Sequence, residues 1–172
     1  GPFSLAGRLM YVSEAMIYCY EEPDMVHTLL CKASDFLIEY CKAYKEAGAN
    51  GIVMAEPLAG LLSPSLAGEF SAPYVKRIVD AVQEDDFIVI YHNCGDTTIQ
   101  TIDSILSTGA AAYHFGNAID MAEMMPLIPA ETIAMGNIDP AREFKNGTPD
   151  SIRSATLSVM EQCCKYPNFV IS

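Results

Sequence analysis

Short runs of β-branched and aromatic residues alternate along the chain with longer segments of helical periodicity. Residues 23–44 carry apolar side chains at steps of three and four, which predicts an amphipathic helix that begins at Pro23 and ends before Gly48. Residues 87–91 form an unbroken apolar run, typical of a strand buried on both faces. The same reasoning predicts strands at 3–6, 52–55, 111–114, 132–135 and 168–171, and helices at 64–82, 97–106, 121–127 and 149–164.

Six predicted strands that alternate with helices indicate βαβ units, a parallel sheet and therefore the α/β class. An open doubly wound sheet and a (β/α)₈ TIM barrel both have this alternation. A complete barrel needs eight strands and usually about 250 residues, so a barrel made by these 172 residues would be incomplete. No linker or internal repeat divides the chain, and we expect a single domain over residues 1–172.

Amino-acid composition and net charge argue against several classes of protein. The chain is 51% hydrophobic, which suits a globular protein, and its net charge of −12 argues against binding to a nucleic-acid backbone. No apolar stretch is long enough for a membrane span, and nothing at the start resembles a secretion signal. The six cysteines lack disulfide-type spacing and are read as free thiols in a reducing cytoplasm. Because the chain does not begin with Met, we expect it to be a piece of a longer protein.

Polar residues gather after the carboxyl ends of the predicted strands, where α/β enzymes place their active sites. Glu56 follows one strand, and the segments 92–95, 114–117 and 136–140 follow the next three. The opposite strand ends carry ordinary turns. This asymmetry favours an enzyme.

His92 and Cys94 are the sharpest candidates. Residues two apart in a strand point to the same side, so an imidazole and a thiol would face one site, as zinc ligands do. The alternative is a buried cysteine beside a hydrogen-bonded core histidine. Glu56 is the best candidate for a third ligand, although it could instead bind substrate or cap a loop. His114 is either a substrate contact or a structural histidine at the rim, by which we mean the edge of the sheet where the strands have their carboxyl ends.

The segments Gly1–Ala6 and Gly136–Pro140 resemble conserved segments of the uroporphyrinogen decarboxylase superfamily. Within it, His92-Asn93-Cys94-Gly95 resembles the zinc branch, which comprises the methylcobalamin:coenzyme M methyltransferases and related corrinoid-dependent enzymes. The resemblance extends over residues 1–172.

This resemblance implies a (β/α)₈ barrel of about twice this length, of which the chain would be the C-terminal part without its first strands. It implies zinc held by His92, Cys94 and a further cysteine after Ser172, with Glu56 as a weak extra ligand. The implied enzyme moves a methyl group from a methylcorrinoid carried by a partner protein to a small thiol such as coenzyme M.

The remaining candidates are substrate contacts. Arg8 could pair with an anionic substrate group or simply be solvated, and His114, Asn117, Asn137 and Asp139 belong to the polar rim. Two rival functions stay open. Metal-free uroporphyrinogen decarboxylation would leave the His92 and Cys94 pair unexplained, and a noncatalytic subunit that binds a corrinoid protein would need no zinc.

Overall fold

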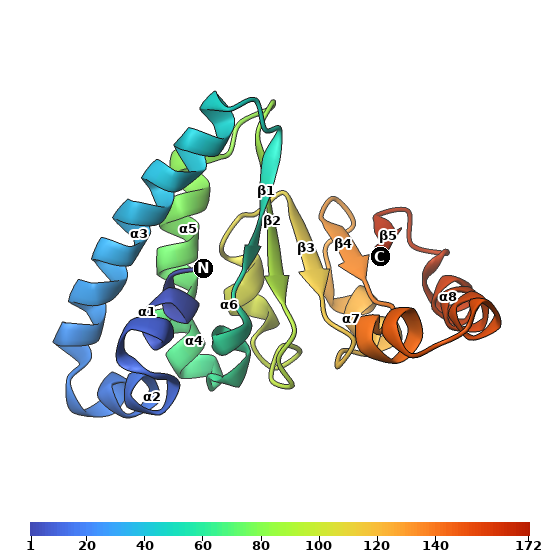
Figure 1. The fold of residues 1–172 in the computed structure, drawn as a ribbon, viewed down its shortest axis with the longest axis horizontal. Coiled ribbons are helices and arrows are strands. Elements are labelled where there is room, and N and C mark those ends of the chain that lie inside the picture. Colours follow the sequence, from blue (N-terminus) through green and yellow to red (C-terminus); the bar gives the residue numbers. More distant parts are fainter.

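A five-stranded parallel sheet forms the centre of the molecule (Figure 1). The computed structural model describes all of residues 1–172. Neighbours in the sheet are also neighbours in the sequence, and every pair is parallel. The strands are β1 (Gly51–Ala55), β2 (Ile88–Asn93), β3 (Ala112–Phe115), β4 (Ile133–Gly136) and β5 (Phe169–Ile171).

Helices precede and connect the strands. Figure 1 shows the long helices α3 and α5 beside β1 and β2, whereas α1, α2 and α4 lie toward the end of the sheet to which the strands point. No helix is long and apolar enough to cross a membrane. The helices are α1 (Pro2–Met10), α2 (Val12–Glu21), α3 (Pro23–Glu46), α4 (Pro64–Phe70), α5 (Ala72–Val82), α6 (Ile102–Leu106), α7 (Met121–Met124) and α8 (Pro149–Cys163), with 3-10 helices η1 (Pro57–Leu61) and η2 (Met125–Leu127) and a π-helical turn η3 (Pro140–Lys145).

Only one face of the sheet is covered. Alternate strand residues such as Tyr91 and Tyr113 are buried in the main hydrophobic core, together with apolar residues of the helices. On the other face Val53 is 63% exposed and Ile133 is 42% exposed. A doubly wound sheet reverses its strand order and carries helices on both faces, whereas a barrel keeps the sequential order and places its helices outside. The structure is therefore part of a (β/α)₈ barrel, and the doubly wound alternative is excluded.

The predicted strand at residues 3–6 is wrong, because these residues belong to α1 and the sheet has five strands rather than six. Pro2 occupies the first turn of this helix, where its missing N–H is not needed. The carboxylate of Glu56 accepts hydrogen bonds from the backbone N–H groups of Phe3 (3.0 Å) and Ser4 (2.6 Å). A contact made across more than 50 residues thus stabilises a helix start that the local sequence does not reveal.

Other helix boundaries also differ from expectation. The predicted helix at 64–82 is divided at Ser71 into α4 and α5, and Pro73 lies in the first turn of the second helix. The predicted helix at 97–106 is helical only from Ile102, since turns occupy the preceding residues. The expected helices at 23–44 and 149–164 are confirmed as α3 and α8.

Candidate functional site

Two histidines face each other at the carboxyl ends of neighbouring strands. The parallel register pairs His92 of β2 with His114 of β3, so their side chains lie on the same face of the sheet. Their ring centroids are 4.7 Å apart, and the two Nδ1 atoms are separated by 2.6 Å. The Nε2 atom of His114 lies 2.8 Å from the hydroxyl of Ser172, directly after β5. These contacts join the ends of three strands through side chains.

A cavity of about 390 Å³ opens at this end of the sheet. Five of the eight predicted site residues line it: His92, Cys94, His114, Asn117 and Asn137. The other lining residues are Phe115, Gly116, Ile138, Pro140, Phe144 and Ser172. The predicted clustering of polar residues at the carboxyl rim is therefore found in the structure.

The loop that carries Cys94 is held by its neighbours in the sequence. The buried side-chain oxygen of Asn93 accepts a hydrogen bond from the N–H of Gly95 (3.0 Å) and lies 3.0 Å from the hydroxyl of Thr98. Gly95 packs against the backbone of Gly60, and a Cβ atom at Gly95 would lie 2.1 Å from the Gly60 carbonyl oxygen. Asn93 therefore folds the turn and Gly95 allows it to pack, which fixes Cys94 between them.

A second glycine keeps space for Cys94 from the other side. A Cβ atom at Gly116, just after β3, would lie only 2.2 Å from the Cβ of Cys94. Because real Cβ atoms do not approach so closely, any side chain at residue 116 would displace Cys94. The thiol is held at the rim by backbone packing on both flanks.

The electrostatics favour neutral imidazoles. Burial lowers the pKa of His92 below its ordinary value, and burial together with the neighbouring His92 lowers the pKa of His114. A neutral imidazole has one nitrogen with a free lone pair, which is the form that binds metal ions. His92 and Cys94 therefore present an imidazole and a thiol to one cavity, and this donor set fits two positions of a zinc site. No group of three or more His, Cys, Asp or Glu residues within residues 1–172 is arranged to hold a metal ion.

The carboxylate of Glu56 lies apart from this cavity. The backbone N–H of Glu56 donates to the carbonyl oxygen of His92 (2.9 Å), so the two residues lie side by side at the carboxyl edge of the sheet. The side chain of Glu56, however, is fully buried and accepts the N–H groups at the start of α1 described above. In this structure Glu56 caps a helix, and its expected contribution to metal binding stays a prediction.

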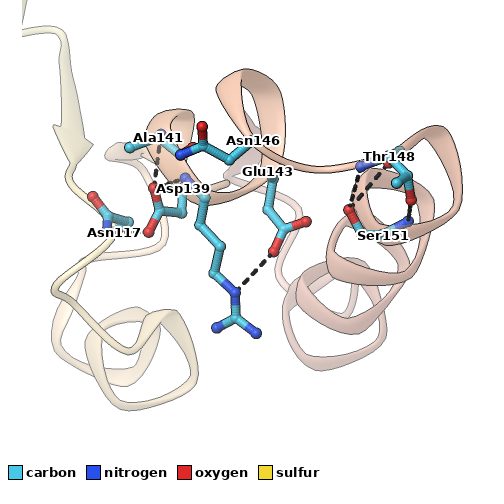
Figure 2. Close-up of polar contacts among 8 residues, drawn as sticks. Asn117, Asp139, Ala141, Glu143, Asn146, Thr148 and Ser151 are labelled. Carbon is cyan, nitrogen blue, oxygen red and sulfur yellow. Dashed lines mark hydrogen bonds and ion pairs between the residues drawn. The ribbon is translucent and has the colours of Figure 1, made fainter.

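Polar residues at the carboxyl edge of the sheet also form hydrogen bonds with one another. Asn117 donates through its side-chain amide to Asp139 (3.0 Å), and Asp139 caps η3 by accepting the N–H groups of Ala141 and Arg142 (Figure 2). Asn137 donates to the carbonyl oxygen of Gly116 (2.9 Å), which ties the loop after β4 to the loop after β3. Asp139 does not line the cavity, so its observed contacts are structural.

Arg8 lies elsewhere on the molecule. It is exposed on α1 and lines a separate cavity of about 530 Å³ with Phe36 and Tyr40 of α3. The structure does not bring Arg8 together with His92 and Cys94.

The model of the family described as uroporphyrinogen decarboxylase (URO-D) matches residues 1–172. The chain belongs to the URO-D family. It is 32% identical over 164 residues to a methylcobamide:CoM methyltransferase of Methanosarcina mazei, which covers 94% of the chain and 47% of that relative. It is 34% identical over 145 residues to a uroporphyrinogen decarboxylase of Chlorobium limicola, which covers 83% of the chain and 40% of that relative. The chain thus spans about half the length, or less, of the URO-D relatives that it matches.

Two residues of this URO-D family chain line the cavity without being among the predicted site residues. Ser172 directly follows β5, so its place at the carboxyl end of a predicted strand is a signal that points to it. Phe144 lies in η3, where it is 63% exposed and lines the cavity. No pattern in the sequence distinguishes it from an ordinary surface residue.

Proposed function

We propose that the protein is a zinc-dependent methyltransferase that moves a methyl group from a methylcorrinoid, carried by a partner protein, to a small thiol such as coenzyme M. The overall reaction converts the thiol and the methylcorrinoid into a thioether, a proton and a demethylated corrinoid. The observation that carries this proposal is the shared cavity of His92 and Cys94 at the carboxyl rim of the sheet.

His92 and Cys94 would hold the zinc ion. Such an ion supplies Lewis acidity, which lowers the pKa of a coordinated thiol and so creates a thiolate nucleophile at neutral pH. His92 contributes a neutral ring, because burial lowers its pKa. Asn93 and Gly95 hold the Cys94 thiol in place through the turn that they form.

The charge of the residues that line the cavity helps to distinguish methyl transfer from uroporphyrinogen decarboxylation. No Lys or Arg lines the cavity, although a substrate with many carboxylates calls for cationic partners. This lack favours a small thiol over a porphyrinogen at this half of the barrel. Uroporphyrinogen decarboxylation is the second candidate, because relatives bearing that name match the chain at a similar identity to the methyltransferases.

Metal analysis of the complete protein tests the proposal. We expect about one zinc ion per chain, together with transfer of the methyl group of methylcobalamin to coenzyme M. His92→Ala and Cys94→Ser should each lose the zinc ion and the activity. Cys31→Ser is the matched control, since Cys31 is exposed on α3 and does not line the cavity.

The two candidates predict opposite results. A protein that binds no zinc and decarboxylates uroporphyrinogen would refute the methyltransferase. Retention of stoichiometric zinc in Cys94→Ser would show that the metal lies elsewhere, and would also refute the assignment.

A further inference from the structure

Only one hydrogen atom fits between the Nδ1 atoms of His92 and His114. Their Nδ1 atoms are 2.6 Å apart, so one nitrogen must donate and the other must accept. Two arrangements are possible for a pair of neutral rings. Either His92 carries its proton on Nδ1 and donates to His114, or His114 donates and the proton of His92 sits on Nε2.

Only the first arrangement leaves His92 able to bind a metal ion through Nε2. When His92 donates from Nδ1, the Nδ1 of His114 is an acceptor and its proton lies on Nε2. That proton points to the hydroxyl oxygen of Ser172, 2.8 Å away, which can accept it. Both imidazole N–H groups named here then have an acceptor.

We propose that His114, supported by Ser172, is a positioning residue that holds His92 in the tautomer with a free Nε2 lone pair. The inference rests on the proposed function, because it assigns a role to His114 at the same zinc site. Hydrogen bonds to the far nitrogen of a ligating histidine generally orient the ring and select its tautomer.

The fold keeps the three residues in place. Strand pairing aligns His92 with His114 directly across β2 and β3. The backbone of Ser172 is fixed on both sides, since its N–H donates to the carbonyl oxygen of Gly136 (3.2 Å) and its carbonyl oxygen accepts the N–H of Ile138 (2.8 Å). The strand pairing and these backbone hydrogen bonds therefore fix the backbone positions from which the three side chains reach one another.

The test compares His114→Ala with His114→Asn in the complete protein. The amide oxygen of asparagine can occupy the place of Nδ1 and accept from His92, whereas alanine offers no acceptor. Zinc affinity is measured by competition with a chromophoric chelator, and the absorption spectrum of the Co²⁺-substituted protein reports the ligand environment. We expect His114→Ala to weaken zinc binding about 10–100-fold and to alter the Co²⁺ spectrum, whereas His114→Asn restores most of both.

His27→Ala is the matched control. His27 binds the hydroxyl of Tyr74 (2.6 Å) and stacks on Phe70, and it does not line the cavity, so its loss should leave zinc affinity unchanged. Ser172→Ala should weaken zinc binding less than His114→Ala, because it removes only the outer support.

The outcomes separate this inference from the proposed function. If the parent protein holds zinc and His114→Ala binds it equally well, the positioning role is wrong and the methyltransferase proposal stands. If the alanine and asparagine variants are equally weak, His114 acts only by packing and the tautomer assignment is wrong. A parent protein without zinc would overturn both.

Discussion

Replacing Gly95 with alanine would test whether close backbone packing holds the Cys94 loop. A Cβ atom there would lie 2.1 Å from the carbonyl oxygen of Gly60, 2.3 Å from its Cα and 2.4 Å from its carbonyl carbon. Ordinary contacts begin near 3.4 Å. The obstructing atoms are backbone and cannot rotate aside, so the loops after β1 and β2 would have to separate by about 1 Å.

The size of the effect follows from this displacement. Overpacking of this kind costs about 1–3 kcal/mol, so the free energy of unfolding of Gly95→Ala should fall by that amount. The shift of the loop also moves Cys94, and a misplacement of about 1 Å near the reacting groups can lower a rate by about 10²-fold. Urea unfolding of the complete protein measures the first effect, and methyl transfer from methylcobalamin measures the second.

Gly68→Ala is the matched control. Gly68 lies inside α4, where an added Cβ would meet only the hydroxyl of Ser104 at 3.5 Å. Alanine is favoured over glycine inside a helix by about 0.5–1 kcal/mol, so this variant should be more stable and fully active. Should Gly95→Ala unfold at the same urea concentration as the parent and keep its activity, the close contact with Gly60 would be refuted.

The remaining predictions concern Glu56 and the cysteines. Glu56→Ala leaves one buried and one partly buried N–H group at the start of α1 without acceptors and should lower the free energy of unfolding by about 1–3 kcal/mol, measured by urea unfolding. Zinc content in the same variant shows whether Glu56 also contributes to the metal site: an unchanged affinity would leave it the cap alone. Alkylation followed by mass spectrometry at pH 8 should modify exposed Cys31 quickly and Cys19 slowly, because burial raises the pKa of Cys19 to about 11 and reduces its thiolate. Cys94 should be protected when zinc is added, and equal labelling with and without zinc would contradict its role as a ligand.

The sheet was largely predictable because its strands have strong local signals. The apolar run at residues 87–91 overlaps β2, and the predicted strand at 111–114 overlaps β3. The rule that active sites gather at carboxyl ends predicts that His92, Cys94 and His114 lie together at one edge of the sheet, and all three line the cavity there. Local pattern and general topology were sufficient for the positions of these residues.

The sequence does not reveal the register of neighbouring strands or the contacts between residues that are far apart along the chain. His92 and His114 are separated by 22 residues, and only the pairing of β2 with β3 places their rings within hydrogen-bond distance. The start of α1 depends on Glu56, and without that contact a short apolar run at 3–6 fits a strand equally well. Side-chain partners at such distances follow from the assembled fold, and a single sequence does not encode them in any local pattern.

The alternation along β2 has a consequence for how chemistry could change on this scaffold. Tyr91, Asn93 and Gly95 secure the strand and its turn, whereas His92 and Cys94 between them face the open rim. Substitutions at 92 and 94 can therefore change the groups that line the cavity, while residues 91, 93 and 95 keep the strand and its turn intact. The chemistry at the carboxyl end of β2 can thus vary at one strand residue and one turn residue without loss of the fold, and the relatives of this chain carry both methyltransferase and decarboxylase names.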